Sequence, residues 1–183
     1  MKAVEILREE HKLIQDVLDS LERGAQRLGS EMKMPADFFV DAADFIRSFA
    51  DDAHHRKEEG VLFKAMARHG FSEDAGPVAV MLADHNEARR LTQLLSEAAE
   101  RLAQGDESAR EEVIMFALAY VKLLRQHIMK EDHILFQMAD RMIPPSEHGA
   151  IEAGFEKVER DEIGPGVHEK YRTLARSLKE RSA

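Results

Sequence analysis

A pattern of histidine, lysine and glutamate occurs twice in this sequence, at residues 54–63 and 127–136. Both segments read His-x-x-Lys-Glu, continue to Leu-Phe and align without a gap. Because residues four positions apart share one face of a helix, the imidazole and the carboxylate of each copy project together. These pairs are His54 with Glu58 and His127 with Glu131. An imidazole beside a carboxylate on one helix face, presented twice, is what a metal site inside a helical bundle requires.

Two further histidines lie within apolar helix faces, His11 in the first expected helix and His85 in the third. The chain thus contains two similar helix pairs, each supplying one histidine and then His-x-x-x-Glu. The candidate metal ligands are His11, His54, Glu58, His85, His127 and Glu131. Imidazoles and carboxylates in this combination suit a first-row transition metal such as iron or manganese. The two carboxylates can bridge a pair of ions and offset their charge in the core, where an unpaired charge is costly.

Each of these features alone has an ordinary structural explanation. A single histidine in an apolar face is usually a hydrogen-bonded core residue, and a single His-x-x-x-Glu is usually a surface pair. The repetition on matching helices favours one shared site. His55 and Glu59 form a second pair at the same spacing, but the repeat favours His54, because His54 aligns with His127 whereas His55 aligns with Ile128.

Other polar residues near these positions leave alternatives open. The residues whose part in the site stays undecided are His55, Tyr120, Asp132 and His168. Asp51 and Asp52, which lie three residues before the two adjacent histidines, are expected to orient imidazoles. The histidines expected to lie away from the site are His69, His133 and His148.

Apolar residues recur at helical spacing along the chain, and Gly or Pro marks the boundaries. Four long helices are predicted, at about residues 2–28, 35–69, 77–104 and 107–142. Short connections favour antiparallel neighbours, so the predicted fold is all-α, an up-down-up-down four-helix bundle over residues 1–143. Residues 144–183 are predicted to form a C-terminal helical extension that packs on the bundle, with a break at Gly164-Pro165-Gly166.

The composition excludes several classes of function. The chain of 183 residues has 26 Lys and Arg against 35 Asp and Glu, a formal charge of −9, and no basic run. It is therefore expected to bind neither nucleic acid nor an anionic membrane. The absence of cysteine excludes disulfides and thiolate metal sites. With no signal peptide and no apolar run of about 18 residues, a cytoplasmic monomer or homodimer is expected.

Together these motifs resemble the hemerythrin-like family, also called the HHE cation-binding domain, over residues 1 to about 142. The resemblance rests on Glu10-His11-Lys12, His54-His55-x-Lys57-Glu58-Glu59 with Leu62-Phe63, Asp84-His85, and His127-x-x-Lys130-Glu131-Asp132 with Leu135-Phe136. It implies a four-helix bundle with a non-haem di-iron centre, in which manganese or zinc are alternatives to iron, and an oxo, hydroxo or water bridge. The implied terminal ligands are His11, His54, His85 and His127, and the implied bridges are Glu58 and Glu131.

One position departs from the oxygen-carrying members of this family. They have a second histidine one turn after the third-helix histidine, where this chain has Arg89. One imidazole fewer predicts more open coordination and argues against simple carriage of O₂. The resemblance then favours binding of, and reaction with, O₂, hydrogen peroxide or nitric oxide in oxidative or nitrosative stress or iron homeostasis, with peroxidase, catalase or oxidase activity. The alternative is a non-catalytic iron or oxygen sensor that signals through the extension.

Overall fold

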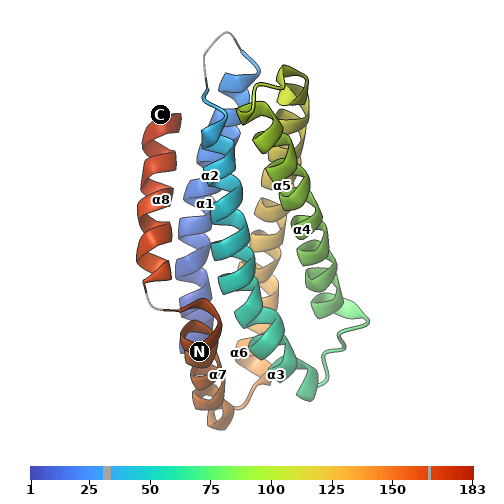
Figure 1. Ribbon diagram of the computed structural model, residues 1–183. Coiled ribbons are helices and arrows are strands. Elements are labelled where there is room, and N and C mark those ends of the chain that lie inside the picture. Colours follow the sequence, from blue (N-terminus) through green and yellow to red (C-terminus); the bar gives the residue numbers. More distant parts are fainter. Residues whose placement is uncertain (31–33, 165) are drawn as a thin grey trace.

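The computed structural model describes residues 1–30, 34–164 and 166–183, the side chain of residue 162 excepted, and within them all regular structure is helical. Four long helical rods lie alongside one another (Figure 1). The first is α1 (Lys2–Leu28) and the third is α4 (Gly76–Ala103). The second consists of α2 (Asp37–Phe45), η1 (Ile46–His55), η2 (Glu58–Leu62) and α3 (Phe63–Arg68). The fourth consists of η3 (Glu107–Ala109), α5 (Arg110–Lys130), η4 (Glu131–Leu135) and α6 (Phe136–Met142).

The rods pack as a four-helix bundle. Helix α5 contacts both α1 and α4, and α2 contacts α4 and α1, which closes the ring. The prediction of an all-α helical bundle is therefore confirmed. None of the described helices is long and apolar enough to cross a membrane.

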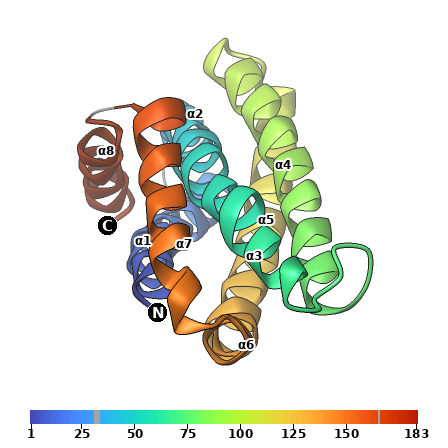
Figure 2. The same ribbon diagram turned by 90° about the horizontal axis from the view of Figure 1, so that it is seen from below.

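The C-terminal extension consists of α7 (Pro145–Val158), η5 (Glu159–Ile163) and α8 (Val167–Ser182). Helix α8 runs along α1 and α2 (Figure 1), and α7 packs against α1 and η2 at one end of the bundle (Figure 2). The approach of α7 is close, because a Cβ atom on Gly154 would lie 2.7 Å from Cγ1 of Val61. Gly164 and Gly166 join the two parts with φ of 87° and 82°, values that glycine adopts without strain.

The apolar core falls into two clusters at different levels of the bundle. One includes Leu18 and Leu124, and the other includes Leu7 and Phe136. Between them, at the level of His11 along α1, lies a layer of buried histidines and carboxylates. Apolar packing on both sides keeps water from this layer, so its polar groups must find partners within the protein or in a bound ion.

Two short π-helical turns stand where the sequence predicts continuous α-helix. Segments η2 and η4 begin at the repeated glutamates, and the N–H groups of Phe63 and Phe136 donate to the carbonyl oxygens of Glu58 and Glu131. A bond from residue i+5 to residue i brings each phenylalanine back to the face of its glutamate. Such turns are frequent at functional sites, and here both copies of the repeat have one.

Candidate metal centre

All six candidate ligands predicted from the repeat lie in the buried polar layer. They come from all four rods of the bundle, and each is at most 1 % exposed. Their side chains form two overlapping groups, within each of which the ligand atoms lie within 4.8 Å of one another. One group consists of His11, His54, Glu58 and Glu131, and the other of His55, Glu58, His85 and His127. The structure therefore brings every predicted residue together.

His55, whose part in the site the sequence left undecided, also belongs to this layer. It is 2 % exposed, and its ring stacks on that of His85 with the centroids 3.9 Å apart. Both histidines reach the interior because η1 is π-helical as far as His55, and successive side chains diverge less in a π-helical turn than in an α-helical one. The signal in the sequence was the second i, i+4 pair, which the alignment with Ile128 set aside.

Glu58 lies between imidazoles from different helix pairs. Its Oε1 is 3.4 Å from Nε2 of His54, and its Oε2 is 3.4 Å from Nε2 of His85. One carboxylate oxygen therefore faces each of the two groups. This is the placement that a carboxylate needs to bridge a pair of ions.

Glu131 occupies the equivalent place on the fourth rod. Its Oε2 is 3.3 Å from Nε2 of His11 and 3.1 Å from Nε2 of His127. The Nε2 atoms of His85 and His127 approach to 3.1 Å. Nitrogen and oxygen atoms from opposite sides of the bundle thus converge on one small volume.

Several of these atoms are buried without a hydrogen bond to any described residue. They are Nε2 of His11, Nε2 of His54 and both carboxylate oxygens of Glu58 and of Glu131. Buried polar atoms are rarely left without a partner, because each costs about 1–3 kcal/mol. A pair of bound cations, one in each group, would satisfy all of them together. Since the donors are imidazole nitrogens and carboxylate oxygens, they fit iron, manganese or zinc better than calcium or magnesium.

Each imidazole in the layer turns its other ring nitrogen to a carboxylate. The Nδ1–carboxylate distances are 3.0 Å for His11 to Asp132, 2.9 Å for His54 to Glu10, 3.3 Å for His55 to Asp51, 2.7 Å for His85 to Glu59 and 3.3 Å for His127 to Asp84. Histidines that bind metal almost always donate this second N–H to a carboxylate, a carbonyl or water, which fixes the ring orientation. Because Nδ1 of all five rings is held in this way, Nε2 is the nitrogen that each ring can offer to an ion.

The other residues that the sequence left undecided lie in different surroundings. Asp132 orients an imidazole, as Asp51 does, whereas Asp52 is exposed and takes no such part, contrary to expectation. Tyr120 is buried in the larger apolar cluster, and burial raises the pKa of its phenol far above the ordinary value. His168 lies in the extension, away from the convergent imidazoles.

The lysine of each repeat supports the histidine that precedes it. Lys57 donates to Glu10, and Lys130 donates to Asp84. These two carboxylates are the ones that hold Nδ1 of the repeated histidines, so the His-x-x-Lys spacing places ligand and support on one rod.

The phenylalanines of the repeat cover the histidines that stand alone. Phe63 stacks on His85, with centroids 5.8 Å apart, and Phe136 stacks on His11, with centroids 5.5 Å apart. Each ring belongs to the smaller apolar cluster, which closes that side of the layer. The Leu-Phe ending of the repeat therefore has a direct role beside the site.

Arg89 supports the site from the position where the oxygen-carrying members of the family have a second histidine. Its Nε is 2.8 Å from Oδ1 of Asp51, and its Nη2 is 2.6 Å from Oε1 of Glu59. These carboxylates orient His55 and His85. His55 brings a fifth imidazole to the layer, and the expectation of more open coordination stays a prediction.

The carboxylates also decide where protons reside when no ion is bound. Burial opposes protonation of His54, but Glu58 and Glu10 outweigh it and raise its pKa to about 10. In the same way, Glu131 and Asp84 overcome burial and raise the pKa of His127 to about 9. Protons on these rings compete with a metal for the same nitrogens.

The metal-free protein is therefore expected to lose stability as the pH rises from about 6.5 to about 10. A raised pKa in the folded state stabilises it fully below the unfolded value, and the contribution disappears as the folded groups lose their protons. A bound ion displaces these protons, so the metal-loaded protein should lack this decline. Urea unfolding of chelator-treated and metal-loaded protein across this range measures the difference, and parallel curves would contradict it.

This chain is similar to known proteins over most of its length. The sequence profile described as "Hemerythrin HHE cation binding domain" matches residues 2–139. Similar curated proteins include uncharacterized protein Rv1995 of Mycobacterium tuberculosis and uncharacterized protein Mb2018 of Mycobacterium bovis. Each is 26 % identical over 162 residues, which cover 88 % of this chain and 63 % of the relative. The chain thus spans less than two thirds of these relatives. No solved structure matches it.

Proposed function

Because this chain belongs to the hemerythrin HHE cation-binding family, we propose that it is a non-haem di-iron protein that binds and reacts with O₂, hydrogen peroxide or nitric oxide. The observation that carries the proposal is the set of buried Nε2 and carboxylate atoms that face one another without a hydrogen-bond partner among the described residues. The carboxylates at the Nδ1 atoms support it, because they hold each ring as a metal ligand requires.

Two groups of residues would hold the ions. His11 and His54 with Glu131 would hold one, and the second would be held by His55, His85 and His127, with Glu58 shared between them. Manganese or zinc would suit the same donors. A pair of iron ions supplies reversible changes of oxidation state and coordination positions for a small ligand. The protein contributes two carboxylates that offset the charge of the ions, and it holds the imidazoles in place before binding.

The burial of the candidate metal centre favours a small molecule over a large substrate. Every side chain that would bind an ion is at most 2 % exposed, and apolar clusters cover the layer on both sides. A diatomic molecule or peroxide reaches such a centre through small fluctuations of packing, whereas a larger substrate requires an open cleft. Exclusion of water also protects a reactive centre from side reactions.

A non-catalytic iron or oxygen sensor is the second candidate. One observation favours it: the buried Lys57, next to the candidate ligand Glu58, also contacts Glu159 of the C-terminal extension. A sensor requires a contact of this kind between its centre and a part that reports the state of that centre. Turnover of peroxide separates the two candidates, since an enzyme consumes peroxide repeatedly and a sensor does not.

The first test is metal analysis of protein purified without an affinity tag and without added metal. We expect a pair of iron ions per chain and a near-UV absorption band that changes on addition of peroxide. The double variant His54→Ala/His127→Ala should lose most of the iron, because it removes one imidazole from each group. His148→Ala serves as a control, since that ring contacts a backbone carbonyl away from the site. Zinc as the only metal, or unchanged iron in the double variant, would contradict the proposal.

A further inference from the structure

Lys57 is a charged side chain with no solvent exposure. A buried ammonium is costly unless it is paired and hydrogen-bonded. Its Nζ donates to two carboxylates, Glu10 of α1 and Glu159 of the extension, the latter at 2.6 Å. One cation on the second rod therefore joins the first rod to the extension, next to the candidate ligand Glu58.

Glu10 transmits this contact to a candidate ligand. Its Oε1 accepts from Lys57, and its Oε2 lies 2.9 Å from Nδ1 of His54. The carboxylate is 8 % exposed, so little water is available to replace either partner. A displacement of the Lys57 ammonium would move Glu10, and with it the ring of His54.

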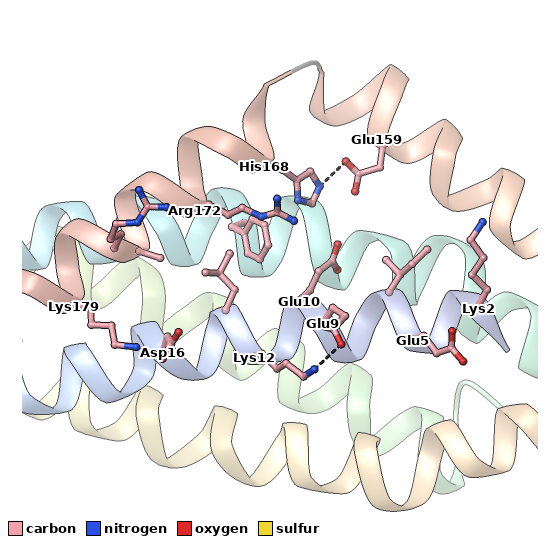
Figure 3. Close-up of a pocket in the computed structure, with 15 residues that line it drawn as sticks. Lys2, Glu5, Glu9, Glu10, Lys12, Asp16, Glu159, His168, Arg172 and Lys179 are labelled. Atoms are coloured by element: carbon pink, nitrogen blue, oxygen red, sulfur yellow. Dashed lines mark hydrogen bonds and ion pairs between the residues drawn. The ribbon is translucent and has the colours of Figure 1, made fainter.

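Glu159 is itself held in place from the other side. Its Oε2 is 2.6 Å from Nε2 of His168, whose ring packs edge-on against Phe49. Figure 3 shows His168 and Glu159 facing each other above Glu10. All of these residues line a groove of about 1070 Å³ between the extension and α1. Burial opposes ionisation of Glu159, but bonds from His168 and Lys57 outweigh it and lower its pKa to about 2.

In the second copy of the repeat, the described residues include no counterpart of Glu159 beside the lysine. Lys130 donates to Asp84, which lies against His127. The Lys130 side chain is 31 % exposed, and among the described residues no second carboxylate pairs with it. The extension therefore reaches the supports of only one half of the centre.

We propose that Glu159 is a positioning residue for the metal centre, acting through Lys57 and Glu10 on His54. Docking of the extension then sets the metal affinity of the half that contains His11 and His54, while the other half is independent of it. This inference rests on the proposed metal-binding function. It assigns the extension a defined role, which is to complete the support of one ion.

The test compares Glu159→Gln with Glu147→Gln in the full chain. Glu147 is a matched control, because it is 34 % exposed against 31 % for Glu159 and also ties the extension to the bundle. Its Oε1 is 2.8 Å from Nε2 of His69, and it contacts none of the candidate ligands. Both variants remove one charge from the extension, but only Glu159→Gln interrupts the contact with Lys57.

Titration with Co²⁺ against a competing chelator measures the two binding steps and the ligand-field spectrum. Glu159→Gln should weaken one step by about 10-fold, the low end of the range for loss of a group that contacts a ligand directly, and change the spectrum of that ion alone. Glu147→Gln should bind like the wild type, and Glu159→Asp should recover part of the loss. Wild-type binding by Glu159→Gln, or equal weakening in both glutamine variants, would overturn the proposal.

A second measurement needs no metal. In ¹⁵N-labelled metal-free protein, the Nδ1 proton of His54 should exchange with solvent about 10-fold faster in Glu159→Gln than in the wild type or in Glu147→Gln. An unchanged exchange rate would overturn the coupling. If the wild type binds no metal, the proposed function fails, and this measurement still decides whether Glu159 holds His54.

Discussion

Glu58→Gln is expected to abolish tight binding of both ions. Glu58 is the residue common to both groups of ligand atoms, and its two oxygens face imidazoles on opposite sides. The amide keeps the shape of the side chain but removes its charge and one of its two acceptor oxygens. The affinity for each ion should therefore fall by more than the roughly 10–100-fold that loss of an orienting carboxylate costs.

Glu59→Gln is the matched comparison for this variant. Glu59 follows Glu58 in the chain but contacts His85 only at Nδ1, 2.7 Å away. Loss of the Glu59 carboxylate should weaken the binding of one ion and leave the binding of the other unchanged. Titration of the chelator-treated proteins with Fe²⁺ without oxygen measures both affinities. Two ions bound with wild-type affinity in Glu58→Gln would show that this carboxylate is not shared between them.

Lys57→Met is expected to have the largest effect on stability. Removal of the ammonium takes one of two cationic partners from the buried Glu10 and the shared partner from Glu159, and loss of one partner from a buried ion pair costs about 3–5 kcal/mol. Lys130→Met is the internal control. Lys130 pairs with Asp84, and its side chain is 31 % exposed. Its loss should therefore lower the free energy of unfolding by only about 0.2–1 kcal/mol. Urea unfolding of both metal-free variants measures the difference. Equal costs would mean that Lys57 has no special role in the core.

Local patterns in the sequence predicted most of the fold and many of the residues of the candidate site. Helical periodicity and boundary residues predicted the four rods and the extension, because both depend on near neighbours in the chain. The spacing His-x-x-x-Glu likewise depends on one turn of helix, so His54 and Glu58 could be paired from the sequence. The repetition of that spacing, with the lone histidine of each helix pair, then identified six of the seven residues that the structure brings together. Their role as metal ligands stays a prediction.

Other features followed only from the way the rods pack. Whether His55 faces inward depends on the π-helical turns of η1. The pattern of the sequence predicts an α-helix there and not these turns. The carboxylate that orients His11 is Asp132, far along the chain, and the partner of Lys57 in the extension is Glu159.

The sequence by itself therefore determined the helices and the ligand pairs within them, because hydrogen bonds and side-chain spacing inside one helix set both. Only the tertiary structure decided which carboxylates hold His11, His54, His85 and His127. Those four contacts join residues on different rods, so they depend on the rotation and depth at which the rods pack, whereas His55 and Asp51 lie four residues apart on one rod. The same packing decided that the extension reaches one half of the centre and not the other.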